Sequence, residues 1–277
     1  MKFGITASTF ATEQRPATFG DGQITRHLQG IKDLGYHGVD LFIRPMGEKN
    51  LVSLRTALDE AGLGVSVIFP IILFEKGLVL SDPDPERRKQ AVLVYKDQID
   101  MAAELKAHIV LGFGRGIAQE GELEGAYHQR LSESLKELSE HGARRGVEIL
   151  LEPIHRYLIS SFNRVDQCLE FFYRFHLGSL KLLLDTFHMN IEEKSLEAAI
   201  RMAGDRIGHV HAVDNNRGAP GDGHIDFKGV IRSLLATGYD RYLSVETQPE
   251  ADPYACARRG IAVLKGILAE LRQEELG

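Results

Sequence analysis

Short apolar runs alternate with amphipathic segments along this chain, eight times and without a Gly/Ser-rich linker. Strand and helix signals that alternate over about 250 residues are typical of an α/β fold with a parallel sheet. The sequence therefore predicts a single domain over residues 1–277, a (β/α)8 TIM barrel. A doubly wound open sheet is the alternative that the same alternation allows.

Each apolar run has the length of a strand, and several begin or end with Gly, Pro or a polar cluster. The runs lie at residues 2–8, 38–43, 64–70, 108–114, 146–153, 180–186, 207–214 and 241–247. Helical segments lie between them. Residues 51–62 end on a glycine, a common helix stop, and residues 82–107 open with Asp and Pro, as helix starts often do. Further helical segments cover residues 195–205, 226–238 and 252–273.

Three connections are longer than the others. Residues 44–50 and 71–82 are expected to be long loops that follow strands. Residues 215–225, NNRGAPGDGHI, are polar and rich in Gly and Pro, and they directly follow a strand. We expect this third segment to be a loop over a functional site.

The amino-acid composition limits the kinds of molecule that this protein is expected to bind. Hydrophobic residues make up 43% and charged residues 26%, as in an ordinary soluble protein, and the net charge of −6 disfavours nucleic acid. The chain has no apolar run of about 18 residues that could span a membrane, and no apolar stretch of a signal peptide. Cys168 and Cys256 form no CxxC pattern. These features predict a cytoplasmic protein without disulfides, with a small-molecule partner.

Four successive strand segments end on a side chain that can bind a metal. ILLE ends at Glu152, LLLD at Asp185 and LSVE at Glu246, while HVHAV carries His211. Each pair of successive residues is separated by about one βα unit. Because the carboxyl ends of barrel strands converge on one face, these four side chains can meet in space.

This set of ligands is mostly oxygen, which suits Mg²⁺, Ca²⁺ or Mn²⁺. One imidazole is compatible with Mn²⁺ or Co²⁺ and does not exclude Zn²⁺. Carboxylates clustered without a cation would repel one another and raise each other's pKa. We therefore expect one divalent ion per chain. The alternative for each carboxylate taken alone is a helix cap or a pair with Arg, but capping does not account for four such residues in register.

Other residues are candidates for contacts with a substrate. His188 can reach the same face, with a structural role as the alternative. Arg217 and His224 lie in the 215–225 loop, where Arg217 suits a substrate hydroxyl or carboxylate. The segment GFGRG, which carries Arg115, only weakly resembles a phosphate-binding loop because it lacks the lysine. His209 should share the strand face of His211, one layer deeper.

Three segments resemble the xylose-isomerase-like TIM barrels, most of all their ketose 3-epimerase branch, which includes D-tagatose 3-epimerase. They are DTFHMNIEE, the H-x-H strand followed by NNRGAPGDGHIDF, and GYDRYLSVE, all between residues 146 and 250. The resemblance implies an Mn²⁺ or similar ion, acid/base roles for two glutamates, and assembly as a homodimer or homotetramer. The implied metal ligands are Glu152, Asp185, His211 and Glu246, the acid/base residues are Glu152 and Glu246, and the substrate contacts include His188 and Arg217.

One segment departs from this family. Family members often read N-R-[FY]-E after the first metal glutamate, whereas this chain reads HRYL, with His155 and Leu158 at the ends. Arg156 is kept, but Leu158 replaces a glutamate that would touch a substrate hydroxyl. We count His155 among the expected substrate contacts. A related branch acts on keto acids and has a similar NRWAPGxGHxDF loop, so an acidic sugar is an open alternative.

These residues suit the removal of a proton next to a ketone. The enediolate that results carries negative charge, which a divalent ion can stabilise, while a carboxylate accepts the proton. Glu152 and Glu246 come from different strands, which suits a two-base epimerisation of a ketose or keto sugar acid. The alternatives are an aldose–ketose or hydroxypyruvate-type isomerase, a sugar dehydratase, and a sugar-binding module with a vestigial metal site. An apurinic endonuclease is disfavoured by the negative charge.

Overall fold

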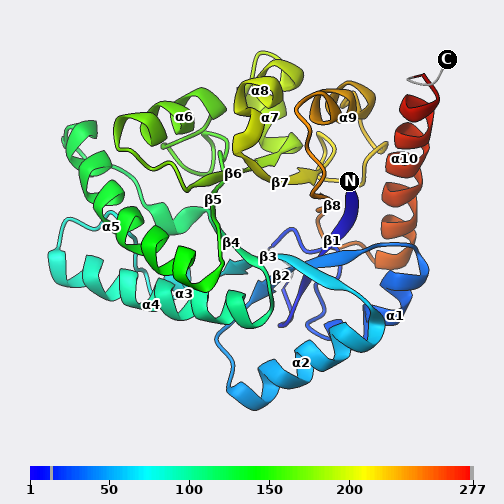
Figure 1. Ribbon diagram of the computed structural model, residues 1–277, viewed down its shortest axis with the longest axis horizontal. Helices are drawn as coiled ribbons and strands as arrows, with labels where there is room; N and C mark the ends of the chain where they lie inside the picture. Colours follow the sequence, from blue (N-terminus) through cyan, green and yellow to red (C-terminus); the bar gives the residue numbers. More distant parts are fainter. Residues whose placement is uncertain (13–14, 275–277) are drawn as a thin grey trace.

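The centre of the fold is a closed barrel of eight parallel strands, seen in a computed structural model that describes residues 1–12 and 15–274 (Figure 1). Each strand pairs in parallel with the next, and β1 also pairs with β8, which closes the barrel. The predicted fold class is therefore confirmed, and the alternative of an open sheet is wrong. The strands are β1 (Lys2–Ser8), β2 (Gly38–Ile43), β3 (Gly64–Pro70), β4 (His108–Leu111), β5 (Ile149–Leu151), β6 (Lys181–Asp185), β7 (Ile207–Ala212) and β8 (Tyr242–Val245).

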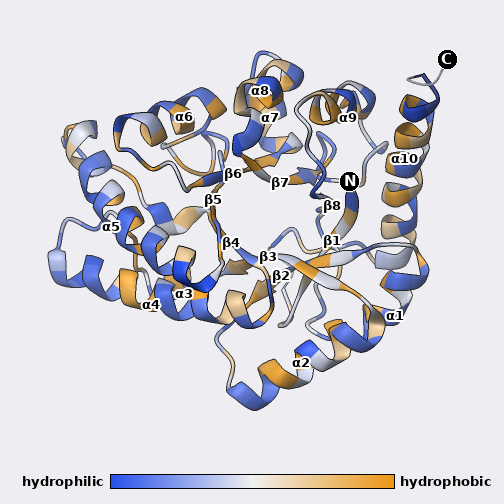
Figure 2. Ribbon diagram, in the orientation of Figure 1, coloured by the Kyte–Doolittle hydropathy of each residue, from blue (hydrophilic) through white to orange (hydrophobic). Residues whose placement is uncertain are grey.

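The helices surround the barrel, and Figure 2 shows hydrophobic and hydrophilic stretches alternating along them. The α4 helix begins as predicted, because the Asp84 carboxylate accepts the N–H of Glu86 and Pro85 occupies the first turn. The two long loops are shorter than predicted, since α2 begins at Glu48 and α3 interrupts residues 71–82. The helices are α1 (Ile24–Asp33), α2 (Glu48–Ala61), α3 (Ile72–Glu75), α4 (Pro85–Glu104), α5 (Glu124–Arg145), α6 (Val165–Arg174), α7 (Thr186–Glu192), α8 (Leu196–Ala203), α9 (Phe227–Ala236) and α10 (Pro253–Glu274).

Side chains along each strand alternate between the helices and the barrel interior. The interior holds a small apolar cluster made of Val67, Val110, Leu150 and Leu183, from four neighbouring strands. Two positions beyond Leu150 and Leu183 come Glu152 and Asp185. The alternation therefore places these carboxyl groups directly above an apolar layer, at the carboxyl end of the barrel.

The strands β4 and β5 are shorter than the apolar runs that predicted them. After β4 the chain turns at Gly112 into a short 3-10 helix (Phe113–Arg115). After β5 comes Glu152, followed by Pro153, which has no N–H to donate to a neighbouring strand. As a result, Glu152 lies on the rim of the barrel rather than inside a strand.

The two cysteines lie on different helices and are buried. Cys168 belongs to α6 and Cys256 to α10, and both are free thiols. Across residues 1–12 and 15–274, no helix combines the length and the apolar composition needed to cross a membrane.

Candidate active site

The structure brings the four predicted metal ligands together at the carboxyl end of the barrel. One ligand atom each of Glu152, Asp185 and His211 lies within 4.8 Å of the other two. Oε1 of Glu246 lies 3.3 Å from Nδ1 of His211. All four side chains are buried. Four strands far apart in sequence thus deliver three carboxyl groups and one imidazole to one place.

Asp185 uses its two carboxylate oxygens differently. Oδ1 accepts the N–H groups of Phe187 at 2.7 Å and His188 at 3.2 Å and so caps α7. Oδ2 is buried, has no hydrogen-bond partner, and lies 3.8 Å from Nδ1 of His211. A helix cap and a metal ligand, which were alternatives for this residue in the sequence, are therefore compatible.

The His211 imidazole also has one satisfied and one free nitrogen. Nε2 donates to Oδ2 of Asp40 at 3.2 Å, whereas the buried Nδ1 has no hydrogen-bond partner and faces Asp185 and Glu246. A carboxylate can only accept here, so it keeps one proton on Nε2 and makes Nδ1 the nitrogen that would bind an ion. Burial lowers the pKa of His211, but Glu246, Asp185 and Asp40 outweigh burial and raise it, so an ion must displace a proton from Nδ1. His209 lies one layer deeper, as predicted, and donates to the same oxygen at 2.8 Å.

Asp40 is a supporting residue that the sequence reasoning missed. It is fully buried in β2, and its other oxygen accepts a hydrogen bond from Ser66. Burial raises the pKa of Asp40, but His209 and His211 outweigh burial, and the net pKa is lowered. The sequence did contain a signal for this role, since Asp40 is the one acidic residue within the apolar run GVDLFI. A buried carboxylate of this kind needs a partner.

The electrostatics of the site fit a divalent cation. Burial, and then Glu246 and Asp185, raise the pKa of Glu152 to about 8. Burial also raises the pKa of Glu246. These crowded carboxyl groups surround two buried atoms without hydrogen-bond partners, Oδ2 of Asp185 and Nδ1 of His211. A cation bound there would satisfy both atoms and relieve the repulsion.

We expect the binding of Mn²⁺ to release protons at pH 7. Glu152, with its pKa near 8, holds a proton at pH 7 that the ion must displace. Protons compete with the ion, so apparent affinity should rise from pH 6 to pH 8. Titration calorimetry in buffers of different ionisation enthalpy measures the released protons. A binding enthalpy that is independent of the buffer at pH 7 would contradict this expectation.

Three predicted substrate contacts, His155, His188 and Arg217, line a cavity beside these residues. The Arg217 guanidinium donates to Oε2 of Glu246 at 3.0 Å and lies over the Phe187 ring at 4.1 Å from its centre. It also lies 3.2 Å from Nε2 of His188. Burial, and then the positive charge of Arg217, lower the pKa of His188 to about 3, so its ring is neutral at pH 7.

The loop after β7 holds Arg217 in place through one carboxylate, that of Asp214. Its oxygens accept the main-chain N–H groups of Gly221 and Gly223 at 2.9 Å and of Ile225 at 3.2 Å. A Cβ atom on Gly223 would collide with Asp214. The loop can therefore pass this close to the Asp214 carboxylate only with glycine at that position. The predicted loop is thus folded around a buried anchor, which the sequence reasoning did not identify.

Two predicted substrate contacts, His224 and Arg115, do not line the cavity. His224 is exposed on the far part of the loop, where its main-chain N–H donates to Asn215. Arg115 is fully buried and donates to the carbonyl oxygens of Gly112 at 3.1 Å, Glu152 at 3.0 Å and Ser161 at 2.7 Å. Neither side chain therefore faces the cavity, and Arg115 ties the ends of β4 and β5 to the following loop.

Arg115→Met should destabilise the fold by about 3–5 kcal/mol, because the carbonyl oxygens now bound by the guanidinium would stay buried without donors. Urea unfolding of the metal-free protein measures this loss. Arg232→Met, which removes an exposed ion pair with Glu274, is the control and should change stability by less than about 0.5 kcal/mol. Unchanged stability of Arg115→Met with a raised KM would restore Arg115 as a substrate contact.

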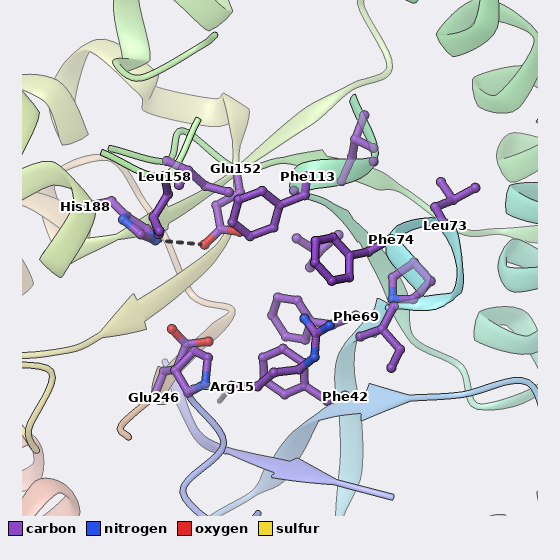
Figure 3. A pocket seen from close by; sticks show the side chains of 18 of the residues that line it. Arg15, Phe42, Phe69, Leu73, Phe74, Phe113, Glu152, Leu158, His188 and Glu246 are labelled. Carbon is purple, nitrogen blue, oxygen red and sulfur yellow. Dashed lines mark ion pairs between the residues drawn. The ribbon is translucent and has the colours of Figure 1, made fainter. Parts of the chain in front are cut away.

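The cavity has a volume of about 420 Å³ and two different walls. Figure 3 shows Glu152, His188 and Glu246 on one side, and Phe42, Phe69 and Phe74 on the other with Arg15 beside them. The carboxyl groups and the imidazole thus lie at one end of the cavity, while Arg15, whose guanidinium lies 5.3 Å from the centre of the Phe74 ring, lines the other.

Known proteins with similar sequences share this arrangement of elements. The pattern of the family described as "Xylose isomerase-like TIM barrel" matches residues 28–267. The D-psicose 3-epimerase of Ruminiclostridium cellulolyticum is 32% identical over 176 residues, 60% of this chain and 58% of that protein. The L-ribulose 3-epimerase of Mesorhizobium japonicum is 28% identical over 83% of this chain and 77% of that protein. The alignment with the first of these relatives thus spans less than two thirds of its length.

A 4-epimerase is also among the similar proteins. The 3-dehydro-D-guloside 4-epimerase of Escherichia coli is 35% identical over 136 residues, 49% of this chain and 52% of that protein. The crystal structure of the E. coli 3-keto-D-glucoside 4-epimerase in its apo form superposes with a TM-score of 0.77 at 26% identity, covering 96% of this chain and 99% of that one. A structure of an L-ribulose 3-epimerase shares the fold with a TM-score of 0.83 at 24% identity, covering 99% of this chain and 96% of that one.

Proposed function

Since this chain belongs to the xylose isomerase-like TIM barrel family, we propose that it is a metal-dependent epimerase that acts on the carbon next to the ketone of a sugar. One observation carries the proposal. Two carboxyl groups, those of Glu152 and Glu246, flank a pair of buried ligand atoms that have no hydrogen-bond partner. The named epimerases among its relatives support the same class of reaction.

Glu152, Asp185, His211 and Glu246 would hold the ion. When bound, the ion supplies Lewis-acid stabilisation of negative charge on substrate oxygens. We propose Mn²⁺, since three carboxylates and one imidazole form a mostly hard ligand set, with which Mg²⁺, Co²⁺ and Zn²⁺ are also compatible. Activity restored to the chelator-treated protein by each ion in turn tests this assignment.

We assign the two proton transfers to the two glutamates. Glu246, which Arg217 holds at 3.0 Å, removes the proton from one face of the reacting carbon. Glu152, which reaches the cavity from β5, returns a proton to the opposite face. In the reverse direction the roles exchange. His188 and Arg217 bind the substrate oxygens beside the reacting carbon.

The names of the relatives describe two kinds of keto sugar, free ketoses inverted at carbon 3 and keto-glycosides inverted at carbon 4. In both kinds the inverted carbon lies next to a ketone, so the same pair of glutamates serves either one. We therefore propose a keto sugar as the substrate. We also propose a homodimer or homotetramer, which rests on the family resemblance, and sedimentation velocity tests it.

Deuterium wash-in tests the proposed reaction. The metal-loaded protein is incubated in D₂O with free ketoses, keto acids and keto-glycosides, and the carbon-bound protons are followed by NMR. We expect loss of the proton next to the ketone together with a new epimer, and neither after EDTA treatment. An aldose product would assign an isomerase instead. Loss of a hydroxyl group as water would assign a dehydratase, and no exchange in any substrate would overturn the proposed function.

A further inference from the structure

We propose that the substrate carries an aryl aglycone that is bound by the apolar wall of the cavity, so that it is an aryl keto-glycoside rather than a free ketose. This inference rests on the proposed function and names its substrate class. The apolar wall consists of five side chains that line the cavity: Phe42, Phe69, Leu73, Phe74 and Phe113.

The rings of this wall are arranged in two layers. Deep in the cavity, Phe42 and Phe69 stack with ring centres 4.5 Å apart and an angle of 17° between the planes. Phe74 and Phe113 form a tilted pair with centres 6.3 Å apart. The outer pair is partly open, since Phe74 is 64% and Phe113 is 38% exposed. Aromatic rings held open beside a site in this way offer edges and faces to another ring.

A free ketose fits this wall poorly. It carries an oxygen on every carbon, and each hydroxyl that leaves water without a new partner costs about 1–3 kcal/mol. The wall residues offer only carbon atoms on their side chains, and Arg15, which lies over the Phe74 ring at 5.3 Å from its centre, is the charged side chain beside them. The polar side chains Glu152, His188, Arg217 and Glu246 lie at the other end of the cavity. In our proposal the polar end binds the reacting carbon and its neighbours, and the wall binds an apolar group attached to the sugar.

Two further observations fit an aglycone. Leu158, which is 52% exposed, lines the cavity beside His155 and adds apolar surface where a polar side chain would bind a hydroxyl. The volume of about 420 Å³ also falls within the range of pockets that enclose drug-sized ligands. We infer an aryl group rather than an alkyl chain because ring pairs gain energy beyond the area that they bury.

Binding to the metal-loaded protein tests this inference independently of turnover. Calorimetry compares phenyl β-D-glucoside with methyl β-D-glucoside, which share the sugar and differ only in the aglycone. We expect a Kd at least about 10-fold lower for the phenyl glycoside, from the apolar area that its ring buries. Equal Kd values would overturn the inference.

Variants of the wall residues test whether the apolar wall causes the difference in Kd between the two glucosides. Phe74→Ala and Phe113→Ala, both at partly exposed positions, should raise the Kd of the phenyl glycoside and leave that of the methyl glycoside unchanged. Tyr173→Ala on α6 removes a more exposed ring, 86% accessible and outside the cavity lining, and should preserve the discrimination. If the wall variants kept the discrimination but dissociated an oligomer in sedimentation, the wall would be an interface between copies and the inference would be wrong.

The corresponding 3-keto glycosides separate this inference from the proposed function. Deuterium exchange should show a lower KM for the phenyl than for the methyl compound, at similar kcat. Tighter binding of phenyl glycosides without any exchange next to the ketone would support the aglycone site and reject the epimerase. Exchange and epimerisation of both compounds with equal KM would support the epimerase and reject the aglycone site.

Discussion

Glu152→Gln and Glu246→Gln should each lower kcat for epimerisation by roughly 100- to 10,000-fold, the usual contribution of a positioned acid or base. The amide keeps the shape of the side chain but neither accepts nor donates the proton at the reacting carbon. The two carboxyl groups reach the site from β5 and β8, and both face the cavity. NMR assays of epimer formation with the metal-loaded variants measure the loss.

Isotope exchange distinguishes two bases from one. With two bases, each variant keeps the glutamate that serves one face, so it should wash deuterium into one epimer without converting it, and the two variants should act on opposite epimers. If a single variant lost exchange with both epimers while the other kept both, one base would suffice. The Mn²⁺ content of each variant must be measured beside its activity, because both residues are also proposed ligands. Glu250→Gln, at an exposed glutamate after β8, is the matched control and should keep full activity.

Asp40→Asn should weaken Mn²⁺ binding by roughly 10- to 100-fold, although Asp40 is not among the proposed ligands. Its Oδ2 accepts from Nε2 of both His209, at 2.8 Å, and His211, at 3.2 Å. An amide can turn its NH₂ group toward these rings, and it lacks the charge that keeps the proton of His211 on Nε2. Nδ1 of His211 would then no longer be reserved for the ion. Competition with a chromogenic chelator measures the Mn²⁺ affinity.

Ser66→Ala is the matched control for Asp40→Asn. It removes the hydrogen bond to the other oxygen of Asp40 but leaves both histidine contacts, so the Mn²⁺ affinity should fall much less. Urea unfolding of the metal-free proteins separates a loss of affinity from a loss of stability. If Asp40→Asn were less stable yet bound Mn²⁺ as tightly as the unchanged protein, Asp40 would support only the fold.

The barrel and the position of the four proposed ligands could be predicted from the amino-acid sequence. Both follow from local periodicity, because a parallel strand is a short apolar run and its carboxyl end is where that run stops. Glu152, Asp185 and Glu246 stand at such ends, and His211 lies in the alternation of its strand. Barrel closure then brings equivalent strand ends to one rim, so residues far apart in sequence can be predicted to meet.

Which other polar residues face that rim could be seen only in the folded protein. Arg115 and Arg217 both follow strands in glycine-containing segments, yet Arg115 is buried among carbonyl oxygens and Arg217 faces the cavity. Asp40 meets His209 and His211 across the barrel interior, and the phenylalanines of the apolar wall come from β2, β3, α3 and the 3-10 helix after β4. Such contacts depend on side-chain direction and on the folding of each loop, which single-chain periodicity does not encode. For this reason the proposed metal ligands could be predicted from the sequence. The contacts that Asp40 makes with the histidines, and the apolar wall, could be identified only in the folded structure.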